Sequence, residues 1–294
     1  MAQGSGPILH DTPIPRWVPR GTHETMDLVD LEQGLRLTAS GGHVLNCSEL
    51  MGLQAALTLL KSQEKVQSIY FWGKIFGTSA DYFIAYSMKE KAGSDFPEKV
   101  FYHAGEDFEF KTVPTISQET AENIIQLKLT LPFEGVPGAS IELEDVQQGV
   151  KLLEAERLAQ VLLEIDFDTA VAPKGAHALH ESNMILPNLD FKGLLASEAT
   201  ALSKYVHFRP PASVAALRAA ARTDTEFFAH FLDDLEGDLP KGCWAVRQDP
   251  SANVVMLKSL NWPGYIAYHV PGTPKFGGMY FGYAQKNRDL PFMI

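Results

Sequence analysis

The apolar and turn-forming positions of the last sixty residues predict a four-strand antiparallel meander. Runs rich in Val, Tyr and Phe are separated by clusters of Pro, Gly, Asn and Asp, which is the pattern of consecutive β-hairpins. The predicted strands are residues 243–247, 253–260, 265–270 and 276–284. In the last strand, Met279 and Phe281 fall on one face, whereas Gly278 and Gly282 fall on the other. The missing side chains on this glycine face predict that another group packs closely against it.

A second alternating pattern predicts a hairpin earlier in the chain, with strands at residues 68–76 and 81–88. The alternation places Ile69, Phe71 and Ile75 on one face of the first strand. The opposite face receives Tyr70, Trp72 and Phe76. Both faces are apolar, so we expect the hairpin to be covered on two sides. Residues 100–103 and 108–112 predict two further short strands.

Apolar residues at helical spacing predict several helices between these hairpins. The first has leucines at positions 50, 53, 57 and 60, with Ser48 as the expected N-cap. Ser117 is the expected N-cap of a second helix, with Thr120 three residues on. Further helical patterns cover residues 145–165, 197–206, 213–222 and 224–235. Helices and hairpins occur in blocks, which predicts an α+β fold in which antiparallel hairpins and the meander pack with segregated helices.

The domain organisation follows from length and composition. Residues 1–25 contain several prolines and glycines and few branched apolar side chains, so we expect a flexible leader. The remaining residues 26–294 suffice for a single α+β domain of one or two lobes, since 45% of the chain is hydrophobic.

The charge balance excludes several classes of partner. The chain of 294 residues has a formal net charge of −11 and a pI near 5.3. Nucleic-acid binding needs a basic face that releases counterions, so neither nucleic acid nor an anionic membrane surface is expected as a partner. No apolar run approaches the roughly 20 residues that span a bilayer. Two cysteines are too few for a disulfide framework or a zinc site, and we expect two reduced, buried thiols in a cytoplasmic protein.

The patterns in this sequence that resemble catalytic, cofactor-binding or metal-binding motifs lack the features that such sites need. The glycines at 277, 278 and 282 lie within a strand pattern, where no helix follows to bind a phosphate. His177 and His180 follow a Pro-Lys-Gly turn without the other ligands of a metal site, which favours a loop position. The acidic run at residues 233–238 has the wrong spacing for calcium and is interpreted as a solvated helix end. We therefore predict no catalytic, cofactor-binding or metal-binding residue.

Several residues are instead candidates for contact with a partner. Phe208 and Arg209 precede two prolines, and the basic side chain could either cap a helix or contact a partner. Trp262 lies at a Trp-Pro-Gly turn, where it is either a core residue or an interface anchor. The apolar tail at 290–294 predicts docking on the meander or in a groove of a partner. The candidate interface residues are Trp262, Phe208, Arg209, Gly278, Gly282 and Phe292.

Six stretches of this sequence, in order, resemble the radial spoke head protein nine family. They are YFWGKIFG at 70–77, DYFIA at 81–85, YVHFRP at 205–210, PKGCW at 240–244, SLNWPG at 259–264 and KNRDLPFM at 286–293. Each motif is weakly specific alone, and their shared order and spacing carry the resemblance. It covers roughly residues 49–294 and leaves residues 1–25 and 133–143 unmatched.

The resemblance implies a structural subunit of the radial spoke head in the axoneme of motile cilia or flagella. It implies association with spoke head proteins of the four/six type, transient contact with the central-pair apparatus and control of dynein-driven motility. A homodimer within the spoke head is a further arrangement that such a scaffold allows. The alternative from another class is a cytosolic enzyme or small-ligand-binding protein of unknown chemistry.

Overall fold

The computed structural model of the chain describes residues 26–89, 96–127, 131–141, 152–179, 185–212 and 231–293. The predicted leader and the predicted helix at 213–222 lie outside the described residues. The same holds for most of the predicted helix at 224–235 and for residues 145–151, where another predicted helix begins.

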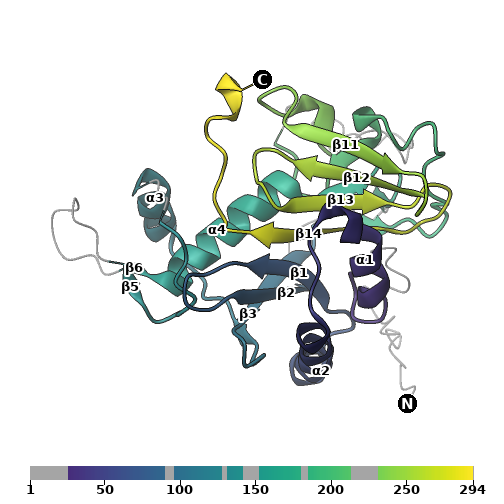
Figure 1. Ribbon diagram of the computed structural model, residues 1–294. Coiled ribbons are helices and arrows are strands. Elements are labelled where there is room, and N and C mark those ends of the chain that lie inside the picture. Colours follow the sequence, from purple (N-terminus) through teal and green to yellow (C-terminus); the bar gives the residue numbers. More distant parts are fainter. Residues whose placement is uncertain are drawn as a thin grey trace, which may run out of the picture.

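Two four-stranded antiparallel meanders form one continuous eight-stranded sheet, in the order β11-β12-β13-β14-β1-β2-β3-β4 (Figure 1). The first contains β1 (Tyr70–Ile75), β2 (Tyr82–Lys89), β3 (Glu98–Ala104) and β4 (Lys111–Thr112). The second contains β11 (Trp244–Asp249), β12 (Val254–Ser259), β13 (Tyr265–His269) and β14 (Phe276–Gly282). The predicted hairpin and C-terminal meander are confirmed. Their union, through the parallel pairing of β1 with β14, was not predicted.

A β-bulge in β1 changes which side chains share a face. The antiparallel register with β2 shifts between Phe71 and Gly73. Ile75 consequently packs in the same core as Tyr70, and Phe76 packs with Phe71. The prediction of simple alternation was therefore wrong for Ile75 and Phe76, because one extra residue reverses the phase of a strand. Gly73 is at the bulge with φ 151°, where an added Cβ would lie 2.1 Å from the carbonyl oxygen of Tyr280.

Helices cover both faces of the sheet, as the two apolar faces of the hairpin predict (Figure 1). One face packs against α1 (Leu31–Thr38) and α2 (Cys47–Glu64), through a core that includes Leu31, Leu53 and Leu57. The other face packs against α4 (Glu154–Thr169), through Leu158 and Leu162 among others. The α+β class is confirmed, and the molecule consists of three layers with the sheet in the middle.

Side-chain capping marks the start of two helices, one of which was predicted at the correct residue. The α2 helix begins two residues before the expected position, because Asn46 rather than Ser48 accepts the hydrogen bond from the Glu49 N–H, over 2.7 Å. Ser117 precedes α3 (Gln118–Leu127) and accepts from the Thr120 N–H, as predicted. No described helix is long and apolar enough to cross a membrane.

Short strands replace two predicted elements. Residues 197–206 were predicted to be helical, but they form turns, a 3-10 helix (Leu202–Lys204) and β10 (Tyr205–His207). Pairing of β10 with β7 (Val171–Pro173) outweighs the helical spacing. Only the end of the predicted strand 108–112 is β-structure, because Phe108 has φ 55° and its ring packs on Phe83. The other short strands are β5 (Ser140–Ile141), β6 (Leu152–Leu153), β8 (His177–Leu179) and β9 (Ile185–Pro187).

Candidate partner-binding surface

Trp262 belongs to the core of the protein. Its side chain is 2% exposed and packs in the cluster that covers the α4 face of the sheet. The indole Nε1 donates a hydrogen bond to Oδ2 of Asp168 over 2.8 Å, and the Lys286 ammonium lies 5.5 Å from the ring centroid. The structure thus agrees with the first of the two alternatives for Trp262. The ring is covered by residues of its own chain, so it offers no exposed anchor to a partner.

The glycine face of β14 packs closely against residues of the same chain. A Cβ on Gly278 would lie 2.4 Å from the hydroxyl oxygen of Tyr265. A Cβ on Gly282 would lie 2.7 Å from the carbonyl oxygen of Pro263 and 2.6 Å from the hydroxyl oxygen of Tyr280. The expected close packing is present, and these two glycines make room for tyrosine side chains of the sheet.

Residues 207–209 connect β10 with neighbouring segments. Nε2 of His207 lies 2.9 Å from Oδ2 of Asp238, which also accepts a 2.7 Å hydrogen bond from the indole of Trp244. Phe208 stacks on the His177 ring, with centroids 4.0 Å apart. The Arg209 guanidinium lies 3.8 Å from the centroid of the Phe167 ring. These contacts hold the segment against the body of the protein.

The acidic run at residues 233–238 was interpreted as a solvated helix end, which is wrong for Asp233 and Asp238, whereas Asp234 and Glu236 are exposed. Asp233 is buried, accepts from the Ala212 N–H and faces Arg209 at 3.6 Å. Asp234 forms an ion pair with Lys174 over 2.8 Å. Asp238 receives the His207 and Trp244 hydrogen bonds described above. Three carboxylates of this run thus bind groups from other segments of the chain.

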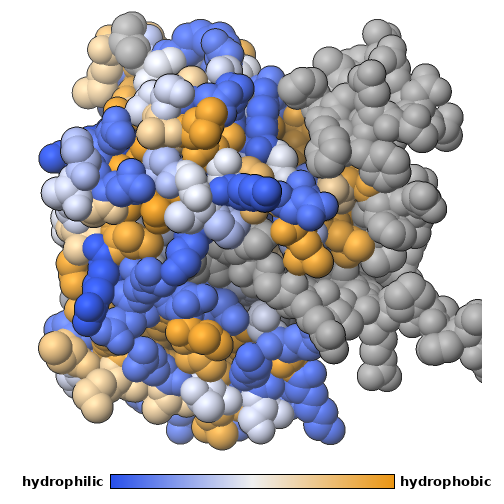
Figure 2. Space-filling view, turned by 90° about the vertical axis from the view of Figure 1, so that its right-hand side faces the viewer, coloured by the Kyte–Doolittle hydropathy of each residue, from blue (hydrophilic) through white to orange (hydrophobic). Residues whose placement is uncertain are grey.

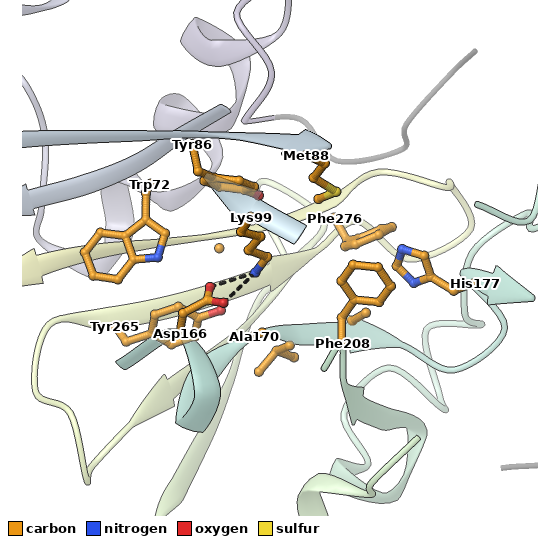
Figure 3. A pocket seen from close by; sticks show the side chains of 13 residues that line it. Trp72, Tyr86, Met88, Lys99, Asp166, Ala170, His177, Phe208, Tyr265 and Phe276 are labelled. Carbon is orange, nitrogen blue, oxygen red and sulfur yellow. Dashed lines mark hydrogen bonds and ion pairs between the residues drawn. The ribbon is translucent and has the colours of Figure 1, made fainter. Parts of the chain in front are cut away.

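Phe208 and Gly278 come together in a shallow pocket on the α4 side of the sheet (Figure 3). Aromatic residues from the strands line it, and the Lys99 ammonium lies 2.7 and 2.9 Å from the two carboxylate oxygens of Asp166. In Figure 3 this ion pair lies between the Tyr86 and Tyr265 rings. The cavity is about 40 Å³, which is room for two or three water molecules. It accommodates the tip of a partner side chain and is too small for a cofactor.

The C-terminal segment carries an exposed apolar tip, which we define as Phe292 and Met293. Its base is fixed, since the Asn287 N–H donates to the Asn261 carbonyl over 2.7 Å and Leu290 is 4% exposed in the core. Phe292 is 89% exposed and Met293 74% exposed. In Figure 1 the segment, in yellow, rises from the end of β14 to the top of the molecule. Residues 290–292 form a 3-10 helix, and Ile294 lies outside the described residues.

Figure 2 shows one face of the molecule, turned by 90° from the view of Figure 1. There, hydrophobic residues occur in small groups separated by hydrophilic ones, which is ordinary for a protein surface. Two large apolar side chains on an anchored base are instead typical of residues that become buried in a complex. Of the six predicted interface residues, Phe292 is therefore the one that the structure presents openly. The sequence did not show that Leu290 is the buried anchor of the tail whereas Phe292 and Met293 are exposed.

The described reactive groups are poorly placed for catalysis. Burial raises the pKa of the Cys243 thiol to about 11, with Asp238 adding to the effect, so the thiolate is scarce at neutral pH. Cys47 is exposed, contrary to expectation, and forms no disulfide. The His207–Asp238 pair could orient a base, but His207 is 1% exposed and out of reach of a substrate. Within the described residues, no three His, Cys, Asp or Glu side chains cluster as metal ligands.

Comparisons with known proteins give a consistent result over most of the chain. The family model of a radial spokehead-like protein matches residues 18–150. Similar proteins include the radial spoke head protein 9 homologs of Bos taurus, 34% identical over 283 residues, and of Homo sapiens, 33% identical over 281 residues. The homolog of Danio rerio is 31% identical over 281 residues. Each alignment covers 92% of this chain and 100% of the relative.

Proposed function

Since this chain belongs to the radial spoke head protein 9 family, we propose that it is a non-enzymatic structural subunit of the radial spoke head in the axoneme of motile cilia or flagella. The observation that carries the proposal is the extent of the similarity, which covers the entire length of each relative. An alignment over 92% of this chain is not confined to one part of the fold.

We propose that the subunit assembles with other spoke head proteins, in particular those of the four/six type. The exposed tip supports this, because burying a Phe or Met side chain contributes roughly 1.5–3 kcal/mol each. An anchored base limits the conformational entropy that is lost when the tip binds. The pocket beside Phe208 is a second candidate contact, for the tip of a single side chain from a partner.

We propose that residues 26–294 act mechanically as one domain. The parallel pair of β1 and β14 joins the two meanders, and apolar cores cover both faces of the sheet. Close-packed interiors have low compressibility and transmit strain. A body of this kind suits a subunit that passes mechanical signals between the central pair and the dynein arms.

The charge of the chain supports an indirect or transient contact with the central pair. A protein with a formal net charge of −11 is repelled by other acidic surfaces, such as that of a tubulin lattice. We therefore expect other spoke subunits to bridge the two structures.

The rival function, an enzyme or small-ligand binder, has little support in the described geometry. The pocket in Figure 3 holds two or three water molecules, and the His207–Asp238 pair is buried. Neither arrangement offers a substrate both space and an accessible reactive group.

Affinity purification from isolated axonemes tests the assembly role. We expect the tagged chain to recover other spoke head proteins. The double variant Phe292→Ser with Met293→Ser should weaken the affinity for them about 30-fold or more, as loss of a hot-spot residue does, and so reduce their recovery. Val29→Ser is the matched control, because Val29 is 80% exposed and lies outside the tip. Equal recovery of these partners with the tip variant and with the wild type would exclude the tip as a contact site. Absence of any spoke protein from the wild-type eluate would overturn the assembly role itself.

A further inference from the structure

The outward face of α2 carries no charge. At 100° per residue, seven residues of this helix lie within an arc of about 120° opposite the buried leucines. They are Cys47, Ser48, Met51, Ala55, Thr58, Leu59 and Ser62, and all seven are exposed. Met51 is 71% exposed and Leu59 59% exposed. A helix at a protein surface ordinarily directs charged and polar residues outward, so an outward face with no charged residue and two large apolar side chains is unusual.

The charged residues of α2 point away from this face. The helix contains three, and Glu49 lies 2.8 Å from the ammonium of Lys74 on β1. Glu64 lies 3.2 Å from the ammonium of Lys89 on β2. Lys61 is partly buried and acts electrostatically on Asp27. In a chain of net charge −11, α2 therefore presents an uncharged strip somewhat more than four turns long, from Cys47 to Ser62.

Four residues of the strip are arranged as two matching pairs about Ala55. The residues four positions before and after it are Met51 and Leu59, both large and apolar. Those seven positions before and after it are Ser48 and Ser62. A second copy that crosses antiparallel at Ala55 therefore places Met51 against the partner's Leu59, and Ser48 against the partner's Ser62. Such a contact uses the same patch on both copies, as a two-fold axis requires.

The side-chain sizes fit this crossing. Met51, Ala55 and Leu59 form one row at a spacing of four residues. Packing of such a row against the three-residue rows of the second copy gives a shallow crossing of about 20°, which keeps Ser48 near the partner's Ser62. The small Ala55 side chain at the crossing point lets the two backbones approach closely. The absence of charge on the strip removes the local repulsion that two acidic copies would otherwise meet.

We propose that the outward face of α2 is a self-association surface, at which two copies of this chain pair antiparallel about Ala55. In Figure 1, α2 lies at the bottom of the molecule and the C-terminal segment at the top, so a dimer leaves the tip free for another protein. The proposal does not rest on the radial spoke assignment, because it concerns the purified chain alone.

Cysteine cross-linking tests the register of this dimer. In a Cys47→Ser background, Ala55→Cys places two thiols at the two-fold axis, and we expect an oxidised dimer on a non-reducing gel. Ser62→Cys is the matched control on the same exposed strip. In the proposed dimer, position 62 faces the partner's Ser48. It therefore lies about 20 Å along the helix from position 62 of the partner, too far for a disulfide between the two. The double variant Ser48→Cys with Ser62→Cys restores cross-linking. Equal cross-linking of Ala55→Cys and Ser62→Cys would overturn the register.

Sedimentation equilibrium tests the association itself. We expect the wild type to dimerise and Ala55→Asp to be monomeric, with a dissociation constant raised about 30-fold or more. Val29→Asp controls for the added charge, and an unchanged melting temperature of Ala55→Asp shows that the exposed substitution leaves the fold intact. A wild type that is monomeric up to its solubility limit would overturn the proposal. A dimer that is unaffected by Ala55→Asp would do the same.

Discussion

The indole Nε1 of Trp262 donates a hydrogen bond to the carboxylate of Asp168, which lies near the end of α4, over 2.8 Å. This bond ties the turn between β12 and β13 to the helix that covers the same face of the sheet. Asp168 also forms an ion pair with Lys286 of the C-terminal segment, over 2.8 Å. One carboxylate thus links the meander, the helix and the base of the segment that carries the tip.

Trp262→Ala is expected to destabilise the isolated protein by about 3–5 kcal/mol, because it removes a large, fully buried side chain. Asp168→Ala should cost less, about 1–3 kcal/mol, since it leaves the indole N–H without its acceptor. Urea denaturation of the purified variants measures both changes. An unchanged stability of Trp262→Ala, together with loss of partner recovery, would contradict the core position and favour the interface alternative.

Glu154 is expected to be essential for the stability of the loop that precedes it. Its buried carboxylate accepts hydrogen bonds from the Tyr82 hydroxyl at 2.7 Å and from the N–H groups of residues 134, 135 and 136 at 2.7–3.1 Å. Glu154→Ala leaves these donors unpaired, so we expect a loss of at least about 3 kcal/mol.

Glu156→Ala is the matched control for Glu154 in the first turn of the same helix. Glu156 accepts one bond, from the Leu153 N–H, and its loss should cost about 1 kcal/mol. Chemical denaturation distinguishes the two variants. Equal losses would show that the buried network around Glu154 adds nothing beyond ordinary capping.

His269 is expected to make the fold sensitive to acid. The ring is fully buried, accepts from the Leu194 N–H at 3.1 Å and lies 3.0 Å from the Lys275 carbonyl. Burial lowers its pKa to about 4, against an ordinary value of 6.5. The folded state therefore binds this proton less readily than the unfolded state. Its stabilising contribution is complete above pH 6.5 and declines as the pH falls toward 4, by about 3 kcal/mol.

The free energy of unfolding, measured by urea titration between pH 4 and 7.5, tests this role of His269. We expect His269→Gln to be less stable than the wild type at pH 7.5 and to have a flatter pH profile. His43 and His103, whose pKa values burial also lowers, are present in both proteins and do not affect the comparison. Parallel profiles of variant and wild type would show that His269 does not titrate in the proposed range.

The isolated chain is expected to bind bare microtubules weakly at every salt concentration, because both surfaces are acidic and salt only screens their mutual repulsion. Co-sedimentation with purified microtubules over a salt series measures this binding. Strong binding that salt does not change would contradict the transient contact with the central pair.

The sequence predicted the elements of the sheet well because their signals are local. Turn clusters and alternating residues marked all eight strands, although β4 is shorter than predicted, and Ser117 marked the start of α3. The errors came from interactions between distant residues. The helical spacing at 197–206 yielded to the pairing of β10 with β7, and the bulge at Gly73 depends on the nearby backbone of Tyr280.

The candidate surface was predicted less completely than the fold, for a similar reason. Whether an aromatic residue at a turn is buried depends on what packs against it, which the sequence around Trp262 does not contain. The tail was correctly singled out as unusual, but its division into the buried Leu290 and the exposed Phe292 required the structure. The uncharged face of α2 was already present in the sequence. A helical wheel would have found it once the inward direction was known.

Detergent extraction of isolated cilia tests the central claim, a structural place in the axoneme, most directly. The full-length chain, tagged and expressed in motile ciliated cells, is followed by immunoblot through removal of membrane and matrix. We expect nearly all of it to remain with the insoluble axonemes, together with other spoke head proteins. Recovery of nearly all of it in the detergent-soluble fraction would contradict the account.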